Sequence, residues 1–483
     1  MSTDAERRHS SSSTLHEGPG AGQKPHGPRQ VQLWDASLKG ARRSFIRSAA
    51  LGLVLTTFFM WACLPIYWGS YFRQPENLYR LAVGLVDLDS PGAQAAGQTP
   101  VAGPALLAAP AQLAGTNHLG FHTLDNTRFD ISSASGSTSR GVDVHKWAAD
   151  AVQNEDYFGV IIANANATTA AVSAYEALSR GVQATYEGMG AYTMYYSEGR
   201  DFETVDQWVA PGMNRLLNQH VLGSAASSLF AQLAPRLSSL SAAQYSAVNQ
   251  TALSSVLAQP FGFSTYNLRP VDEFAGIPAT TVGMLYLLIF TYFCSLFFYN
   301  ARQSVESKVP LGELIAMRLI VPILQYIPIS LFISLVTMAF KVNFHRFYGA
   351  GGFPLFWLSN FLCMTGAGMP MEIALTFLGP RYTAFFLIFW VITNVSVAFL
   401  DLADMDHFYS YGFGLPIFQA VQNGKTIIFG TKARFGQYFG IEIAWALGGM
   451  AALVLVIVFK RRQAVREAEN KRAAEEEKGV KEL

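Results

Sequence analysis

Residues 278–299 read PATTVGMLYLLIFTYFCSLFFY, and this stretch decides the fold because no Asp, Glu, Lys or Arg interrupts it. A helix needs about 20 mainly apolar residues to cross the hydrocarbon core of a bilayer. Three further stretches of comparable length follow before residue 400, namely Leu314–Phe340, Phe353–Leu378 and Tyr382–Leu400. Residues 277–400 are therefore predicted to form four transmembrane helices.

Two more apolar stretches, Ser48–Gly69 and Ile441–Phe459, stand apart from that block. Hydrophobic residues make up 51% of the chain and charged residues only 14%, which is typical of a membrane protein. The sequence thus predicts a polytopic α-helical membrane protein with six transmembrane helices. The first helix occupies residues 41–69, a large insert follows, and five helices complete the chain. The net charge of +1 gives no indication of a nucleic-acid partner.

Positive charge is concentrated at both ends of the chain. Residues 1–47 and residues 460–483 each contain eight Lys or Arg. Such residues gather beside the cytoplasmic ends of membrane helices, so both termini are predicted to be cytoplasmic. Residues 1–40, rich in Ser, Gly and Pro, are predicted to be a disordered tail. Residues 460–483 are predicted to be a charged helical tail, either a solvated helix or one that docks a partner.

The insert, residues 70–276, is predicted to form an extracytoplasmic α+β domain. It contains ten Lys or Arg against seventeen Asp or Glu, a net charge of −7, which a solvated surface explains. Residues 90–115 are rich in Gly, Ala and Pro and are expected to be a flexible loop. Alternating or apolar patterns predict strands within residues 77–90 and at Tyr157–Ala163, and helices at Thr168–Arg180 and Val205–Leu233.

Two glycosylation sequons lie in the insert, and they make Asn166 and Asn249 glycosylation candidates. Chance explains two sequons equally well. A third sequon begins at Asn394, inside a predicted membrane helix, where it is expected to be inert. All three cysteines also fall in predicted membrane helices, so no disulfide is expected in the insert.

Ionisable residues within the predicted membrane helices are the candidate functional residues, because a charge in the bilayer is costly unless it is paired or lines a polar path. Glu372 lies in the fourth helix, and Arg318 lies at a comparable depth in the third. The two are predicted to pair, either as a structural clasp or as a proton- or substrate-coupling site. The other transport candidates, which interhelical hydrogen bonds explain equally well, are Gln325, Asn360 and Asn394.

No motif in the sequence indicates an enzyme. The sequence Gly424-Lys425-Thr426 resembles the end of a phosphate-binding loop, but Gln419 stands where that loop needs glycine. No Ser, His and Asp grouping and no cysteine pair indicates hydrolysis or redox work. We therefore expect no catalytic residue, cofactor or metal site. A cluster of acidic residues and one histidine follows the fifth predicted helix and comprises Asp401, Asp404, Asp406 and His407. We interpret it as a solvated helix end, with a divalent cation site as the alternative.

Four stretches carry a resemblance to a known family. They are NLYRLAVGLVDLD (77–89), NEDYFGVIIANANATTAAVSAYEAL (154–178), FGFSTYNLRPVDEFAGIPATTVGMLYLLI (261–289) and YGFGLPIFQAVQNGKTIIFGTKARFGQYFGIEIAW (411–445). Together they resemble the fungal nitrosoguanidine-resistance membrane proteins. That family is similar in architecture to the bacterial phage-infection-protein group and to permeases of type-2 ABC exporters. The resemblance extends over about residues 42–462.

The resemblance implies the one-plus-five arrangement, a plasma-membrane location and an outer segment, residues 401–440, that folds back toward the bilayer. The apolar character of Leu415–Ile428 independently argues against an ordinary surface loop. We accordingly expect Tyr411–Phe429 to lie in the outer leaflet.

Two functional hypotheses follow. The first is a permease-like protein that confers resistance to nitrosoguanidine-type or other toxic compounds by moving amphipathic drugs or lipids through the bilayer, with any ATP supplied by a partner ATPase. The second is a non-transporting factor that scaffolds lipid-translocating pumps and so alters plasma-membrane lipid asymmetry. The sequence does not specify the oligomeric state, and a homodimer is one alternative.

Overall fold

The computed structural model describes residues 36–129, 142–180, 182, 186, 188–238 and 259–481. The chain divides into two compact units, Met1–Phe58 and Phe59–Leu483. In the first unit, the described residues form the short helix η1 (Ala36–Leu38) and the beginning of α1 (Lys39–Tyr71). The second unit contains a five-stranded sheet and a bundle of long apolar helices.

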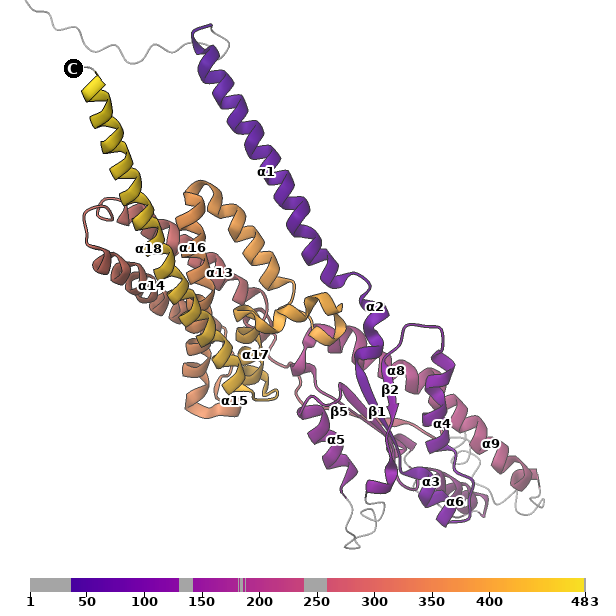
Figure 1. Cartoon of the computed structure of the whole chain (residues 1–483). Helices are drawn as coiled ribbons and strands as arrows, with labels where there is room; N and C mark the ends of the chain where they lie inside the picture. The colour runs from indigo at the N-terminus through magenta and orange to yellow at the C-terminus, as the bar shows by residue number, and fades with distance from the viewer. Residues whose placement is uncertain are drawn as a thin grey trace, which may run out of the picture. The chain divides into compact units, whose positions relative to one another are not determined.

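Among the described residues, five helices are long and apolar enough to cross a membrane. The first includes α1, and the others include α13 (Val282–Arg302), α14 (Leu311–Ala339), α16 (Gly352–Val395) and α18 (Phe435–Lys481). The last four helices pack against one another as a bundle, with α16 in contact with the other three (Figure 1). The chain is thus rich in apolar membrane-length helices, as predicted, while the count of six spans stays a prediction.

The long helix α16 reverses its direction at Gly379. The backbone there has φ 71° and ψ 170°, outside the helical region and open to glycine. Across this point, Trp390 Nε1 donates a hydrogen bond of 3.1 Å to the carbonyl oxygen of Ala367, a residue 23 positions away. In a continuous helix these residues would be about 35 Å apart, so the two limbs of α16 lie antiparallel (Figure 1). The limbs correspond to the helices predicted at Phe353–Leu378 and Tyr382–Leu400.

The segment predicted to fold back toward the bilayer, residues 401–440, contains a buried helix. Two short helices, η11 (Leu402–Asp404) and η12 (His407–Gly414), lead into α17 (Pro416–Phe429). Every residue of α17 except Gln422 is buried. This burial arises because α13, α16 and α18 all pack against α17, and it explains why the segment is so apolar. The placement of the segment in the outer leaflet stays a prediction.

The region between α1 and α12 (Gly276–Ala279) forms a layered domain around one sheet. The strand order is β2-β1-β3-β4-β5, and β3 and β4 form the antiparallel pair among parallel neighbours. The strands are β1 (Ala82–Asp87), β2 (Gly120–Thr123), β3 (Gly159–Ala163), β4 (Tyr192–Tyr196) and β5 (Phe263–Asn267). The longer helices are α3 (Asp89–Ala95), α4 (Ala102–Ala108), α5 (Val144–Gln153), α6 (Ala167–Ser179) and α9 (Leu222–Ser238).

Helices cover both faces of this sheet. Side chains alternate along a strand, so Leu85 lies in a core shared with α4, α6 and α9, whereas Val86 lies in a second core shared with α5. Burial on both faces explains the continuous apolar sequence of β3. The predicted strands within residues 77–90 and at Tyr157–Ala163 contain β1 and β3, and the helix predicted at Thr168–Arg180 is α6.

The expectation of a flexible loop over residues 90–115 is wrong. This region forms α3, α4 and the short helix η3 (Ala109–Leu113). Apolar side chains of α4 and η3 lie in the core of the domain. Its small residues allow close packing, since a Cβ atom on Gly103 would clash with the Asp87 carboxylate. Glycine and alanine here mark tight contact between elements rather than freedom of the backbone.

The fold of this region depends on the buried carboxylate of Asp89, and its loss is expected to be costly. Asp89 accepts hydrogen bonds from the Thr168 backbone N–H at 2.7 Å and the Ala102 backbone N–H at 3.2 Å. Asp89→Ala leaves the Thr168 N–H and hydroxyl without their acceptor, whereas the Ala102 N–H keeps Thr168 Oγ1 as an acceptor at 3.2 Å. The substitution should lower the free energy of unfolding by about 3 kcal/mol. Hydrogen exchange in the full-length protein should report faster exchange in α4 and α6. Asp150→Ala, at an exposed position of α5, is the control, and equal exchange in both variants would contradict the role of Asp89.

Candidate functional site

A cluster of charged side chains joins three helices of the bundle, and we call it the Glu372 cluster (Arg302, Glu306, Arg318 and Glu372). Glu372 lies in the first limb of α16 and is completely buried. Its Oε2 atom accepts a hydrogen bond of 2.9 Å from Arg302 Nη1 at the end of α13 and lies 3.4 Å from Arg318 Nη2 of α14. The structure therefore brings Arg318 and Glu372 together, as the sequence predicted, and adds Arg302.

The charges of the Glu372 cluster balance within it. Glu306 Oε2 lies 3.3 Å from Arg302 Nε, so two guanidinium groups face two carboxylates. Thr376 accepts a hydrogen bond from Arg318 and donates one of 2.8 Å to the Glu372 carbonyl oxygen. Glu372 Oε1 and Arg318 Nε have no hydrogen-bond partner in the described chain, so the balance is one of charge. These ion pairs have the geometry of a clasp that holds α13, α14 and α16 together.

Sequence reasoning missed Arg302 because it ends the apolar run of α13, where a cation is expected to face water. In the structure its side chain is buried, and its guanidinium carbon lies 5.3 Å from the ring centroid of Phe298 and 5.1 Å from that of Tyr299. The aromatic residues one turn earlier could have signalled that this arginine turns inward.

A second buried carboxylate, Glu442 of α18, lies among neutral partners, and we call this group the Glu442 site (Ser359, Asn423 and Glu442). Glu442 is completely buried and accepts a hydrogen bond of 2.9 Å from Ser359 Oγ of α16. Asn423 Nδ2 of α17 lies 3.0 Å from Ser359 Oγ and 3.5 Å from Glu442 Oε2. Unlike the carboxylate of Glu372, that of Glu442 forms no ion pair with any residue in the described part of the chain.

The sequence did not identify Glu442 either. It is the second residue of the predicted helix Ile441–Phe459, where a carboxylate is expected to lie at the water boundary. The helix instead begins at Phe435, so Glu442 lies about two turns inside it and faces α16 and α17. Helix starts are the least certain part of such a prediction.

Polar side chains continue from the Glu442 site toward α14. Asn360, the neighbour of Ser359, donates a hydrogen bond of 2.9 Å to Ser334 Oγ, and Trp357 Nε1 donates one of 3.1 Å to Ser330 Oγ. The Oδ1 atoms of Asn360 and Asn423 are buried and have no hydrogen-bond partner in the described chain. The Glu442 site therefore belongs to a polar layer across the bundle, about 20 Å along α16 from Glu372.

The remaining predicted residues lie outside these two sites. The side chain of Asn394 donates within its own helix, to the Trp390 carbonyl oxygen at 2.9 Å, and Gln325 is half-buried on α14. No described hydrogen bond or ion pair joins either of them to Glu372 or Glu442. Asn166 is exposed before α6, and Asn249 lies outside the described residues.

The interpretation of the acidic group after α16 as a solvated helix end is wrong for one of its members. Asp404 is completely buried, where it accepts a hydrogen bond from Gln74. Asp406 and His407 are exposed, whereas Asp401 pairs with Arg200 at 3.3 Å. Within the described ranges, no group of three or more His, Cys, Asp or Glu side chains could hold a metal ion.

Burial raises the pKa of Asp404 to about 7, although the hydrogen bond from Gln74 lowers it in part. An unfolded Asp titrates near pH 4, so between about pH 4 and 7 the folded chain holds a proton that the unfolded chain has lost. The contribution of Asp404 to stability is therefore fully present below about pH 4 and is lost as the pH rises through 7.

Asp404→Asn should accordingly stabilise the protein at pH 8 and have little effect at pH 4.5. The expected gain at pH 8 is at most about 4 kcal/mol, the cost of ionising the buried carboxyl group. Thermal unfolding of the purified protein at the two pH values measures it. Asp406→Asn, two residues away and exposed, is the matched control. A stabilisation by Asp404→Asn that does not vary with pH would contradict the assignment.

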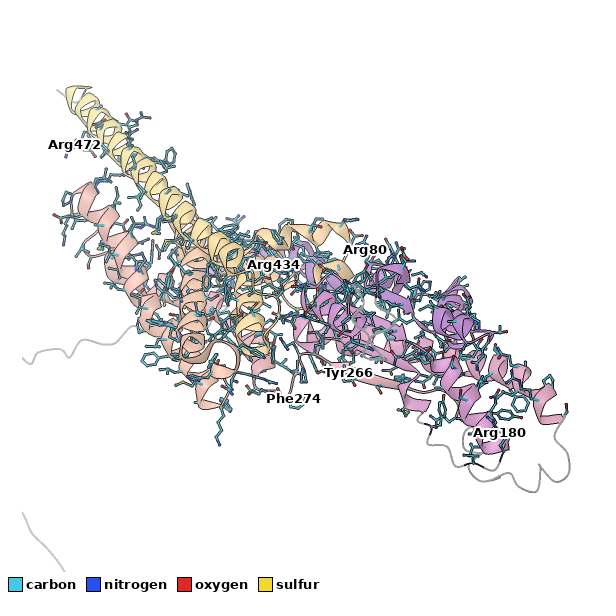
Figure 2. All side chains as sticks on the ribbon, turned by 90° about the horizontal axis from the view of Figure 1, so that it is seen from below. Arg80, Arg180, Tyr266, Phe274, Arg434 and Arg472 are labelled. Carbon is cyan, nitrogen blue, oxygen red and sulfur yellow. The ribbon has the colours of Figure 1, made fainter. Side chains whose placement is uncertain are left out.

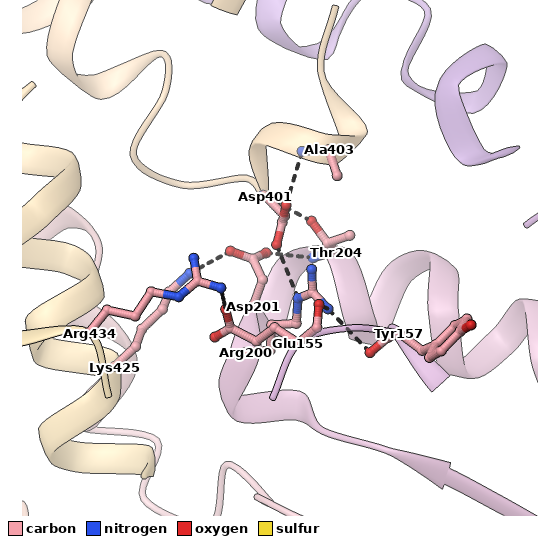
Figure 3. A network of polar contacts seen from close by, with 9 residues as sticks. All are labelled: Glu155, Tyr157, Arg200, Asp201, Thr204, Asp401, Ala403, Lys425 and Arg434. Atoms are coloured by element: carbon pink, nitrogen blue, oxygen red, sulfur yellow. Dashed lines mark hydrogen bonds and ion pairs between the residues drawn. The ribbon is translucent and has the colours of Figure 1, made fainter. Parts of the chain in front are cut away.

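Ion pairs connect the layered domain to α17 and to the start of α18. Figure 2 shows Arg434 at the junction between the layered domain and the helix bundle, both of which belong to the second unit. Arg434 Nη2 lies 3.4 Å from Glu155 Oε2, and Lys425 Nζ lies 2.5 Å from Asp201 Oδ2 (Figure 3). Lys425 is buried with its carboxylate partner, so the Gly424-Lys425-Thr426 sequence serves an internal ion pair.

Comparisons with known proteins support the prediction that this chain is a membrane protein. The family model described as "Protein of unknown function (DUF3533)" matches residues 52–451. An uncharacterized endoplasmic reticulum membrane protein of Saccharomyces cerevisiae is 24% identical over 340 residues, which are 70% of this chain and 64% of the relative. No solved structure matches the chain. Because the family match covers most of the sequence and includes Glu372 and Glu442, the chain belongs to the DUF3533 family of proteins of unknown function.

Proposed function

We propose that this protein is a membrane carrier, not an enzyme, that moves an amphipathic molecule or lipid through the bilayer. The observation that carries the proposal is the completely buried carboxylate of Glu442, whose described partners are all neutral. A carboxyl group without a cation partner inside a bundle of membrane helices costs several kcal/mol when it ionises, and it is typically kept where it binds a proton or a cationic group during function. Glu442 is the proposed coupling residue, and the Glu372 cluster holds the bundle around it.

An apolar groove supports an amphipathic substrate. It has a volume of about 760 Å³ and lies between α13 and α14. Tyr286, Phe290, Phe332 and Val336 line it, and all four side chains are exposed. Ser334, which binds Asn360 of the polar layer, lies on the same helix between two of these residues. Residues two positions apart lie on opposite sides of a helix, so Ser334 is buried and faces α16, whereas Phe332 and Val336 face the groove. An apolar tail in this groove would therefore lie on the outer side of α14, with the polar layer on the inner side of the same helix.

The proposal includes a topology. Both limbs of α16 enter the membrane, which gives six spans, and both termini face the cytoplasm. The layered domain within residues 70–276 then lies outside the cytoplasm. The proposed location is the plasma membrane, whereas the yeast relative is an endoplasmic reticulum membrane protein. Fluorescence microscopy of the tagged chain separates the two locations.

Flux into or out of sealed liposomes tests the function. Purified protein is reconstituted, and the loss of a preloaded labelled drug and the movement of a labelled aminophospholipid are followed with and without a proton gradient. The proposal expects gradient-dependent flux above that of protein-free vesicles, and its loss in Glu442→Gln. Absence of flux for both probes from well-folded wild-type protein would overturn it.

A second function, a scaffold for lipid-translocating pumps or for a partner ATPase, is favoured by the end of α18. This helix continues to Lys481, and its residues from 462 to 475 are all exposed. Such a charged helix is suited to docking a partner. Under this alternative, protein truncated after residue 465 still folds but no longer captures the partner and no longer confers resistance to nitrosoguanidine. A carrier without a docked partner keeps its resistance after the same truncation.

A further inference from the structure

The junction between the layered domain and the helix bundle contains a small pocket lined by charges of both signs. Its volume is about 200 Å³, and we call it the head-group pocket. Arg200 Nε lies 3.3 Å from Asp401 Oδ2, and Arg434 Nη2 lies 3.4 Å from Glu155 Oε2 (Figure 3). Two cations and two carboxylates therefore face one cavity, so its lining favours a ligand that carries one charge of each sign.

The pocket is built rather than incidental. The Arg200 guanidinium carbon lies 3.4 Å from the ring centroid of Phe158, and Arg200 Nη1 donates to the carbonyl oxygens of Glu155 and Tyr157 at 3.3 and 3.2 Å. Glu155 has a φ of 62°, a conformation that a residue with a side chain seldom adopts. Burial raises the pKa of Glu155, and the nearby Arg200 and Arg434 oppose that rise. The protein thus holds these charges in fixed, partly desolvated positions.

The head-group pocket lies at the level where membrane helices end. One candidate span begins at Phe435, next to Arg434, and another ends at Val395, six residues before Asp401. Charged lipid head groups occupy this level of a bilayer, and aromatic residues gather there. Phe413, Phe418 and Tyr438 form the aromatic part of the pocket wall. A ligand with a polar head therefore reaches this pocket from the membrane surface.

A second cavity, an apolar groove, lies further along α18, and we call it the α18 groove. It has a volume of about 480 Å³. Gly414, which lines the groove, follows Phe413 of the pocket, and Ile441 lies one turn beyond Tyr438 on the same helix. The other groove residues on α18 continue that face and are Ala444, Trp445, Gly448, Gly449 and Ala452. From Tyr438 to Ala452 the helix rises about 21 Å, enough to follow an acyl chain through one leaflet.

We propose that the head-group pocket and the α18 groove together bind one phospholipid whose head carries a phosphate and an ammonium group, as in phosphatidylethanolamine. The phosphate contacts Arg200 and Arg434, the ammonium group contacts Asp401 and Glu155, and an acyl chain lies in the groove. This inference names a substrate class for the proposed function. The claim that the protein moves the lipid rests on that function, whereas the claim that it binds the lipid does not. Binding is measured without flux, so the two proposals can fail separately.

Two variants test the two halves of the site. Arg434→Gln removes a phosphate contact, and its control is Lys432→Gln, a nearby cation outside the pocket lining. Gly448→Leu fills the groove, since a Cβ atom at Gly448 meets no atom within 4 Å. Gly440→Leu is its control, because that glycine is equally open, belongs to the same helix and lies outside both cavities. Each pair thus changes the same chemistry inside and outside the site.

Native mass spectrometry of the full-length protein in detergent measures binding of phosphatidylethanolamine, phosphatidylglycerol with the same acyl chains, and free phosphoethanolamine. The proposal expects phosphatidylethanolamine to bind most tightly, and expects Arg434→Gln and Gly448→Leu each to weaken it about tenfold or more, while both controls bind as wild type. Equal binding of the two lipids would overturn it, as would equal effects of variants and controls. Phosphoethanolamine that binds as tightly as the lipid, regardless of Gly448→Leu, would show a soluble ligand instead.

Discussion

Glu372→Leu is expected to destabilise the protein by about 3–5 kcal/mol and to reduce its abundance sharply. The variant leaves Arg302 and Arg318 with Glu306 as the one remaining carboxylate of the Glu372 cluster. Both guanidinium groups are buried between membrane helices, where an unpaired charge is costly. Unfolding of the purified protein in detergent measures the loss, and fluorescence of a fused reporter measures abundance.

A second substitution separates charge balance from loss of packing. Glu372→Leu combined with Arg318→Leu leaves the Arg302 and Glu306 pair, so the cluster is neutral again. The double variant should recover at least half of the lost stability, because replacing a buried ion pair with apolar side chains is often nearly neutral. Glu313→Leu, an exposed position in the first turn of α14, controls for the loss of one negative charge. A single variant as stable as wild type would show that the cluster is not a clasp.

Part of this architecture could be predicted from the sequence because the bilayer imposes a length on apolar segments. The number of residues from the ends of two such segments placed Arg318 and Glu372 at a comparable depth in the membrane, and this was enough to predict that they pair. The strands β1 and β3 were predictable for a similar reason, since their patterns are short, apolar and bounded by polar residues. In each case one local pattern determined the element.

The features that were not predicted depend on contacts between distant segments. Arg302 and Glu442 lie near the ends of apolar runs, and the surrounding helices determine whether such a side chain faces water or the bundle. Asp404 is buried because Gln74, 330 residues away in sequence, lies against it. The helices α3 and α4 were mistaken for a loop because small residues serve both close packing and flexibility. Local composition does not distinguish these alternatives.

The difference between the two carboxylates predicts opposite effects of neutralising them. Glu442 is as deeply buried as Glu372, but its partners Ser359 and Asn423 are neutral. Glu442→Gln keeps a side chain of the same size that can still accept from Ser359, and it removes the cost of burying an ionisable group without a cation partner. The variant should therefore be at least as stable as wild type, with an increase of about 1–3 kcal/mol in the free energy of unfolding at pH 8.

A stabilising substitution that abolishes activity identifies a residue kept for function, because a purely structural residue shows the reverse. In sealed liposomes, Glu442→Gln should reduce gradient-dependent flux to the level of protein-free vesicles. Glu442→Asp keeps the charge on a shorter side chain and should retain part of the flux. Ser359→Ala removes the hydrogen bond and leaves the carboxylate in place, so flux should persist with an altered pH dependence. If Glu442→Gln is instead both unstable and fully active in the molecules that remain folded, the carboxylate is a structural hydrogen-bond acceptor and the coupling site lies elsewhere.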